Sequence, residues 1–283
     1  MSEAATATPT AAQILAEPGA PVVVFDRVRL AFDDKVVLQD ISFTLIKGHT
    51  KIILGASGSG KSTALKIITG LLKADAGVVW VNGQRVDQLT EHEMMAVRAD
   101  LGMIFQEGAL FDSLTVRENV GYKLYEETAM PLEEVDRRVE EVLGFIGLGE
   151  HIDKMPSELS GGQRRRVAIA RAMAFKPRIL LYDEATTGLD PITATTVDDE
   201  IIKLRDLESV SSIVVTHQLR DAFYIATHMA VRRPDGTVAI APATRAKERE
   251  AEFIMLRDGL ISFEGDADQL RDSRDPYLRE FLS

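Results

Sequence analysis

The stretch Gly55-Ala-Ser-Gly-Ser-Gly-Lys-Ser62 decides the fold, because it matches in full the pattern of a phosphate-binding loop. Residues 51–54 before it predict an apolar strand, and residues 61–69 after it predict a helix. Glycines let several backbone N–H groups converge on one anion, and the helix N-terminus adds positive partial charge. We expect Lys61 to contact the β- and γ-phosphates of a nucleotide and Ser62 to bind Mg²⁺. An incidental glycine-rich turn is the plainer alternative.

Two carboxylates follow a second apolar strand, predicted over Ile179 to Tyr182. In an open α/β sheet, ligands collect at the carboxyl ends of the strands. Asp183 is therefore a candidate ligand of Mg²⁺, and Glu184 a candidate to orient or activate the water that attacks the γ-phosphate. Taken alone, an acidic strand–loop junction is common; beside a complete phosphate loop, the pair favours catalysis.

A second glycine-rich segment, Leu159-Ser-Gly-Gly-Gln163, precedes a predicted helix. A capping box explains Ser160 and Gln163 by itself. Two successive glycines also allow a phosphate to approach the backbone closely. Arg164 to Arg166 follow in the first turn, where the helix dipole disfavours cations, and a nearby anion would account for them.

Composition narrows the class of protein. Of 283 residues, 33 are Lys or Arg and 44 are Asp or Glu, so the net charge is −11 and a dedicated nucleic-acid binder is disfavoured. Cysteine is absent, which excludes disulfides and thiolate chemistry. We expect neither a membrane-spanning helix nor a secretory signal.

The predicted fold is α/β: a mostly parallel sheet with flanking helices around the phosphate loop, an N-terminal antiparallel β subdomain and an α-helical subdomain. Short strands are expected over Val22 to Phe25, Val28 to Phe32 and Ile41 to Ile46, and a hairpin over Phe253 to Phe263. Capping-box spacing predicts three helix starts, at Thr90, Thr115 and Ser160. The expected segments are a disordered tail over 1–20, a main domain over 21–265 with its helical part near 88–175, a solvated insertion near 233–252, and a C-terminal helical extension over 266–283.

These segments together resemble the ATP-binding subunits of ABC transporters, over roughly residues 22–265. The family's motifs stand in the family's order: the phosphate loop Gly55 to Thr63, Gln106, the signature Leu159 to Gln163, the acidic strand Ile179 to Glu184, Gly188-Leu-Asp190 and His217. One departure is Ala185, where the family usually has Pro.

The resemblance implies the roles that one chain cannot show. Two copies are expected to face head to tail, so that the phosphate loop of one and the signature of the other enclose each ATP. Glu184, His217, Lys61 and Gln106 are the expected catalytic residues, and Ser62, Gln106 and Asp183 the expected Mg²⁺ ligands. The residues expected to contact ATP are Phe32, which would stack on adenine, with Gly55, Ala56, Ser57, Gly58, Ser59, Gly60, Lys61, Ser62, Thr63, Ser160, Gly161, Gly162, Gln163 and Asp190.

Some of these residues also have a simpler structural explanation. His217 could be an ordinary polar residue at a strand end, Asp190 only an N-cap, and Phe32 a core residue.

The run Gly108-Ala-Leu-Phe111, with Val116 and Asn119-Val120, is similar to ATPases of Mla- and Mce-type lipid transport systems. That likeness implies phospholipid transport across the bacterial envelope, and small accessory cytoplasmic and periplasmic lipid-binding subunits. It also implies an inner-membrane permease that docks near Gln106 to Phe111, so that the chain is peripheral at the cytoplasmic face. Alternatively, Leu110 and Phe111 only pack the helical subdomain, and the chain serves an importer of a small polar solute. A non-transport ABC protein and a regulator without turnover are the remaining rivals.

Overall fold

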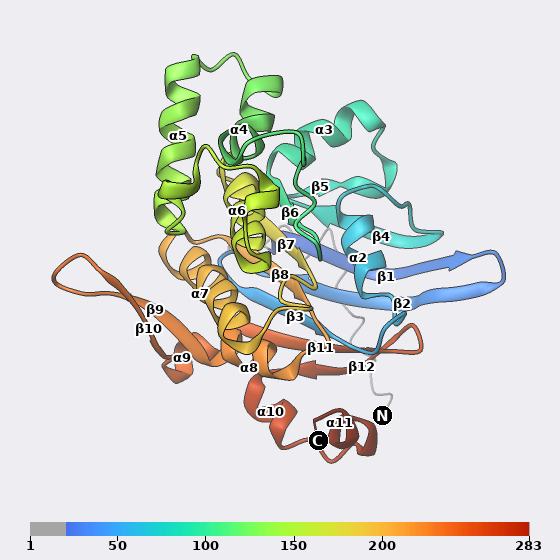
Figure 1. Ribbon diagram of the computed structural model, residues 1–283. Helices are drawn as coiled ribbons and strands as arrows, with labels where there is room; N and C mark the ends of the chain where they lie inside the picture. Colours follow the sequence, from blue (N-terminus) through green and yellow to red (C-terminus); the bar gives the residue numbers. More distant parts are fainter. Residues whose placement is uncertain (1–20, 283) are drawn as a thin grey trace, which may run out of the picture.

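The computed structural model describes residues 21–282, so the predicted tail over 1–20 lies outside the described residues. Its centre is a six-stranded sheet in the order β12-β11-β3-β8-β7-β6, with parallel pairing from β11 to β6 (Figure 1). The central strands are β3 (Thr50–Leu54), β8 (Ser211–Val215), β7 (Ile179–Asp183) and β6 (Leu101–Ile104). The predicted α/β fold with a mostly parallel sheet is confirmed.

A second, four-stranded sheet is antiparallel, in the order β2-β1-β4-β5. Its strands are β1 (Val23–Phe32), β2 (Lys35–Leu45), β4 (Ala76–Val81) and β5 (Gln84–Arg85). Alternation along β3 explains how the two sheets join: Ile53 faces the core shared with the antiparallel sheet and α2, whereas Ile52 and Leu54 face the core shared with the helices on the other side.

Capping boxes start three of the helices as predicted, at Thr90, Thr115 and Ser160. Asp190 caps a fourth through hydrogen bonds from the backbone N–H groups of Ile192 and Thr193. The main helices are α2 (Lys61–Ile68), α3 (Glu91–Ala99), α4 (Val116–Glu127), α5 (Leu132–Phe145), α6 (Gly161–Met173), α7 (Pro191–Leu207) and α8 (Leu219–Thr227). Short 3-10 turns lie at Val86–Gln88, Gly149–His151 and Pro156–Glu158.

Two regions differ from the sequence-based expectation. Strand β6 lies inside the region predicted as mostly helical, because a four-residue strand is too short to show a period of its own. The expected solvated insertion contains β10 (Val238–Pro242), which pairs with β9 (His228–Arg232) in a ribbon that projects beside α7 (Figure 1). It also contains α9 (Arg245–Glu248), whose Lys247 pairs with buried Asp206 at 2.9 Å.

The predicted C-terminal hairpin is confirmed as β11 (Ala251–Arg257) and β12 (Leu260–Gly265). Strand β11 joins the central sheet next to β3, and it begins at Ala251, inside the range predicted as an insertion. Two short helices follow, α10 (Ala267–Arg271) and α11 (Pro276–Leu282). None of the helices within residues 21–282 is both long enough and apolar enough to span a bilayer.

Asp198 in α7 makes stability depend on pH. Its side chain is fully buried, and within residues 21–282 neither carboxylate oxygen has a hydrogen-bond partner. Burial, with a further contribution from the charge of Asp221, raises the pKa of Asp198 to about 8. The folded state thus holds a proton that the unfolded state loses above its ordinary pKa of 3.8, so stability is lost as pH rises from 3.8 to about 8.

We expect Asp198→Asn to flatten this dependence, because an amide cannot ionise. Thermal unfolding at about pH 6 and about pH 8.5 measures the pH dependence of stability. Between these two pH values, the unfolding midpoint of the wild type should fall more than the unfolding midpoint of the variant. Equal falls in both proteins would contradict the assignment. Asp199→Asn is the control, because Asp199 accepts a hydrogen bond from Tyr224 and is half-buried rather than fully buried.

Candidate active site

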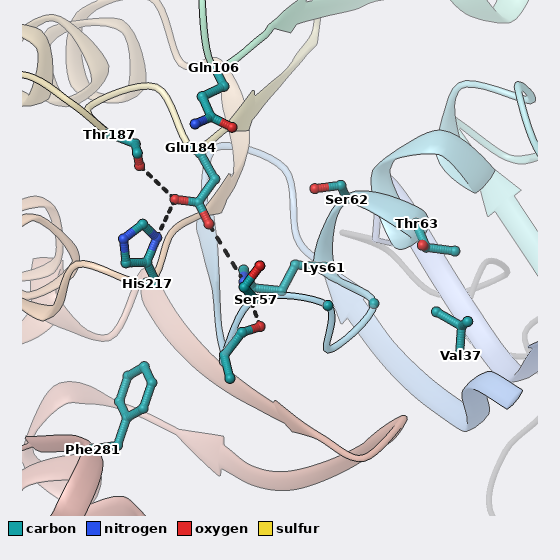
Figure 2. A pocket seen from close by; sticks show the side chains of 13 residues that line it. Val37, Ser57, Lys61, Ser62, Thr63, Gln106, Glu184, Thr187, His217 and Phe281 are labelled. Carbon is teal, nitrogen blue, oxygen red and sulfur yellow. Dashed lines mark hydrogen bonds and ion pairs between the residues drawn. The ribbon is translucent and has the colours of Figure 1, made fainter. Parts of the chain in front are cut away.

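Four parallel strands end at one edge of the central sheet, and each delivers a predicted site residue there. The phosphate loop and Lys61 follow β3, Asp183 ends β7 and Glu184 follows it, and His217 lies just beyond β8. Gln106 follows β6, the strand that sequence periodicity missed. Figure 2 shows the side chains of Lys61, Glu184, His217 and Gln106 around one pocket. Adjacent strand ends, rather than nearness in sequence, therefore assemble the site.

The phosphate loop holds its shape through glycines and through Lys61. Gly60 is the N-cap of α2 with φ of 101°, and a Cβ there would lie 2.7 Å from Leu38 Cδ2 and 2.9 Å from the Val37 carbonyl oxygen. Lys61 is 5% exposed, and its ammonium donates hydrogen bonds to the carbonyl oxygens of Gly55 at 2.8 Å and Ala56 at 3.1 Å. A single buried cation is thus fixed at the mouth of the loop.

Glu184 is the centre of a polar network. Its Oε1 lies 3.5 Å from Lys61 Nζ, and its Oε2 accepts a hydrogen bond from Thr187 Oγ1 at 2.7 Å and lies 2.5 Å from His217 Nδ1 (Figure 2). The residue has φ of 55°, a left-handed conformation that is uncommon for a residue with a side chain. Its N–H donates to the Val215 carbonyl at 2.9 Å, which ties the turn to the end of β8.

The predicted Mg²⁺ ligands offer the oxygen atoms that this ion prefers. Ser62 Oγ donates a hydrogen bond to Asp183 Oδ1 at 2.7 Å, and Gln106 lines the same pocket as Ser62. Burial raises the pKa of Asp183, which the hydrogen bond from Ser62 opposes and the charge of Glu184 reinforces. No cluster of three or more His, Asp or Glu side chains forms a metal cage in the described part of the chain. Few protein ligands together with phosphate oxygens suit Mg²⁺, so the residues present fit the ion.

The cavity at this edge has a volume of about 510 Å³, which is in the range of small-molecule sites. It is lined by Val37, Ala56, Ser57, Gly58, Gly60, Lys61, Ser62, Thr63, Gln106, Glu184, Thr187, His217 and Phe281. Of the other predicted residues in this region, Gly55 and Ser59 belong to the same loop, and Asp183 is reached through Ser62.

Phe32 and the signature segment do not line this cavity. Phe32 ends β1 with 48% of its surface exposed, and Val37 of β2 lines the cavity instead. The signature starts α6, where the hydroxyl of Ser160 accepts from the Gln163 N–H and Gln163 Oε1 accepts from the Ser160 N–H. Within one chain, therefore, this part of the predicted ATP contact set stays apart from the phosphate loop.

Gly162 in the signature is required by packing between helices. A Cβ at this position would lie 2.0 Å from Cγ2 of Thr193 in α7. The hydroxyl of Thr193 donates to Asp190 Oδ2 at 2.5 Å, so the starts of α6 and α7 are packed together. The two roles considered for Asp190, N-cap and ATP contact, are compatible, because Asp190 caps α7 and lies beside the signature.

The three arginines after the signature donate hydrogen bonds to backbone carbonyls. These carbonyls, and not the bound anion that the sequence suggested, account for arginines at the start of α6. Arg164 donates to the Leu159 carbonyl at 2.7 Å, and Arg166 donates to the Ile146 carbonyl at 3.1 Å. Arg165 is 8% exposed and donates to the carbonyls of Ala185 at 3.0 Å and Thr187 at 3.3 Å. Burial lowers the pKa of Arg165.

Comparison with known proteins agrees with this geometry. The family model described as "ABC transporter" matches residues 38–187, more than half of the chain. The protein TRIGALACTOSYLDIACYLGLYCEROL 3, chloroplastic, of Arabidopsis thaliana is 36% identical over 89% of this chain and 71% of its own length. The probable amino-acid ABC transporter ATP-binding protein y4tH of Sinorhizobium fredii is 35% identical over 82% of this chain and 96% of its own. The dimeric post-hydrolysis structure of the ATP-binding cassette MJ0796, bound to ADP and Pi, superposes with a TM-score of 0.70 at 30% identity, covering 86% of this chain and 98% of that chain.

This chain belongs to the ABC transporter family. It is an ATP-binding subunit and an ATP-hydrolysing enzyme of that family, and its nucleotide and cofactor are ATP and Mg²⁺. The resemblance stated from the motifs is thereby confirmed at the level of the family.

Sequence reasoning missed three residues that line the cavity of this ABC ATPase. Val37 comes from the edge of β2, Thr187 from the turn after Glu184, and Phe281 from α11 at the other end of the chain (Figure 2). Thr187 had one signal, since it is a hydroxyl residue in the turn directly after Glu184 and such residues often form hydrogen bonds within turns. No local signal marks Phe281, because the tertiary fold alone brings α11 to the phosphate loop.

Proposed function

We propose that two copies of this chain hydrolyse ATP at their shared interface and thereby drive a membrane permease that transports lipid. The observation that carries the proposal is that the predicted ATP contacts lie in two separate places on one chain. One cavity gathers Lys61, Glu184, Gln106 and His217, whereas the signature starts α6 outside it. A second copy placed head to tail supplies that signature, as a self-complementary twofold interface requires. The dimeric state of MJ0796, a similar cassette, supports this arrangement.

Each side chain then has a role that its position suits. Lys61 binds the β- and γ-phosphates from the mouth of the loop, and Ser62 and Asp183, with Gln106, hold Mg²⁺. Mg²⁺, when bound, neutralises charge that develops on the phosphate oxygens. Glu184 accepts a proton from the attacking water, and His217, 2.5 Å from its Oε2, orients that carboxylate and contacts the γ-phosphate. Phe32, at its exposed position, is assigned to the adenine.

A groove beside the Gln106 loop is the proposed permease site. It has a volume of about 370 Å³ and is lined by aromatic side chains, among them Phe105, Phe111, Tyr122 and Phe175. Phe111 is 43% exposed and packs on Tyr122 with ring centroids 4.6 Å apart. An apolar residue of a cytoplasmic permease helix would fill this groove as an anchor. The chain would then be peripheral at the cytoplasmic face of the membrane.

The loop that carries Phe111 is held by one buried side chain. Asn119, fully buried in α4, accepts from the Phe111 N–H at 2.8 Å and donates to the carbonyls of Phe111, Leu114 and Thr115 at 3.0 Å. Leu110 packs against the helical core while Phe111 stays outside it. The alternative in which both residues only pack accounts for Leu110, whereas Phe111 packs on Tyr122 and still leaves 43% of its surface exposed.

A lipid is the proposed cargo, of the kind handled by Mla- and Mce-type systems with their accessory lipid-binding subunits. The segment Gly108 to Phe111 supports it, together with the plant relative whose name contains that of a galactolipid. A small polar solute is the second candidate, because the Sinorhizobium relative is named for amino-acid transport. We also propose the domain boundaries that the sequence predicts. They are a main domain over 21–265, with a helical part near 88–175 and an insertion near 233–252, and a C-terminal extension over 266–283.

Purification from gently solubilised membranes tests partner and cargo together. We expect a permease to co-purify with the chain and the complex to retain phospholipid beyond what bulk membrane explains. Phe111→Ala should reduce the recovered permease by about tenfold, because it removes a central aromatic contact, while ATP binding by the isolated chain is unchanged.

Leu132→Ala is the matched control, because Leu132 is 70% exposed at the start of α5, away from the groove. Equal permease recovery with Phe111→Ala and with wild type would contradict the docking site. A complex with a polar solute and no retained lipid would replace the lipid cargo by the second candidate.

A further inference from the structure

The signature helix is bonded to the catalytic turn inside one chain. Arg165, five residues after Ser160, reaches from α6 to the turn that follows β7, where its Nε donates to the Ala185 carbonyl at 3.0 Å and its Nη2 to the Thr187 carbonyl at 3.3 Å. The side chain is 8% exposed, so water competes little for these bonds. A buried guanidinium thus connects the helix that the signature starts to the turn that carries Glu184.

The same turn ends on the catalytic carboxylate. Thr187 donates from its N–H to the Glu184 carbonyl at 3.1 Å and from its hydroxyl to Glu184 Oε2 at 2.7 Å. Glu184 itself is in the left-handed region, with φ of 55°. Such a conformation persists where surrounding bonds hold it. Position 185 is Ala, which has none of the rigidity of a Pro, so these bonds fix the turn.

We propose that Arg165 and Thr187 are positioning residues that connect the signature helix to Glu184. The inference rests on the proposed function, in which the signature of each copy contacts the ATP held by the other. A displacement of α6 by one ATP is then passed through the carbonyls of Ala185 and Thr187 to the carboxylate that serves the second ATP. The two sites of the pair are coupled through this chain of hydrogen bonds, within each copy.

The chemistry of the arginine suits this role better than that of a lysine. The planar guanidinium offers several donors in a fixed fork, so it can hold two carbonyl groups at once. An ammonium on a flexible stem keeps the charge but does not hold two acceptors in a fixed relative position. Arg165→Lys therefore removes the positioning while it preserves the charge.

The test uses steady-state ATP hydrolysis by the full chain in its permease complex. Thr187→Val should lower kcat by about tenfold with little change in KM for ATP, because a hydrogen bond to the carboxylate is lost. Thr187→Ser restores the hydroxyl and should recover wild-type kcat within about twofold. Arg165→Lys should lower kcat and reduce the Hill coefficient for ATP, since it loosens the connection between the sites.

The double variant measures whether the two residues act through one chain. Arg165→Lys combined with Thr187→Val should be no slower than the slower single variant, because both act on the same carboxylate. Arg166→Lys is the matched control, since the neighbouring guanidinium bonds the Ile146 carbonyl instead, and its kcat and Hill coefficient should equal those of wild type. Thermal unfolding checks that every variant is folded.

Effects of Arg165→Lys and Thr187→Val that multiply in the double variant would show independent actions and overturn the proposed connection. So would an Arg165→Lys enzyme that keeps wild-type cooperativity. A wild-type complex that hydrolyses ATP without cooperativity would instead contradict the paired sites of the proposed function, and the coupling with them.

Discussion

Glu184→Gln is expected to slow ATP turnover by about two to four orders of magnitude, the range for loss of a general base. The amide keeps the size of the side chain and can still interact with Thr187 and His217, which lie 2.7 and 2.5 Å from Oε2. It cannot accept the proton of the attacking water. ATP binding should persist because Lys61 and the loop are unchanged, and the pair of copies should accumulate in its closed, ATP-bound form.

Single-turnover hydrolysis, ATP binding by equilibrium methods and size-exclusion chromatography measure these three effects. Glu133→Gln is the control, because Glu133 is an exposed residue in the first turn of α5 and undergoes the same chemical change. Turnover by Glu184→Gln close to that of wild type would remove Glu184 from the role of base. Loss of ATP binding would assign its charge to the nucleotide site rather than to the water.

Lys61→Ala should lower kcat/KM for ATP by about two to three orders of magnitude, the usual cost of losing one preorganised donor to a developing charge. The ammonium is fixed by the carbonyls of Gly55 and Ala56 and lies 3.5 Å from Glu184 Oε1. Its removal takes away the cation that binds the β- and γ-phosphates and frees the loop carbonyls. Nucleotide binding should weaken together with turnover, in contrast to Glu184→Gln.

Lys66→Ala is the control for this substitution. Lys66 lies in the same helix α2, is exposed, and does not line the cavity, so its loss should leave ATP binding and hydrolysis near wild type. Circular dichroism and thermal unfolding of both variants separate an effect on the site from an effect on the fold. Normal ATP hydrolysis by Lys61→Ala would overturn the assignment of the phosphate loop.

Local sequence patterns predicted much of the fold because their causes are local. Thr90, Thr115 and Ser160 start helices through side-chain bonds to residues three positions on, and the structure has each of those bonds. Short elements were harder to predict. β6 has only four residues, too few for a periodic signal, and it forms because a neighbouring strand pairs with it. β10 lies between a turn and a charged run, and these two features predicted a solvated insertion instead.

The amino-acid sequence alone determined the chemistry of this protein: a loop from Gly55 to Ser62 that can bind phosphate, carboxylates at Asp183 and Glu184, and a histidine at 217 in the order typical of ABC ATPases. These are properties of residue type and short spacing. Only the tertiary structure decided which distant groups meet. Parallel pairing of β3, β8 and β7 brings the three motifs to one edge, and packing of α6 on the turn after β7 gives Arg165 the carbonyls of Ala185 and Thr187. Such contacts depend on strand order and helix packing, which no short stretch of sequence contains.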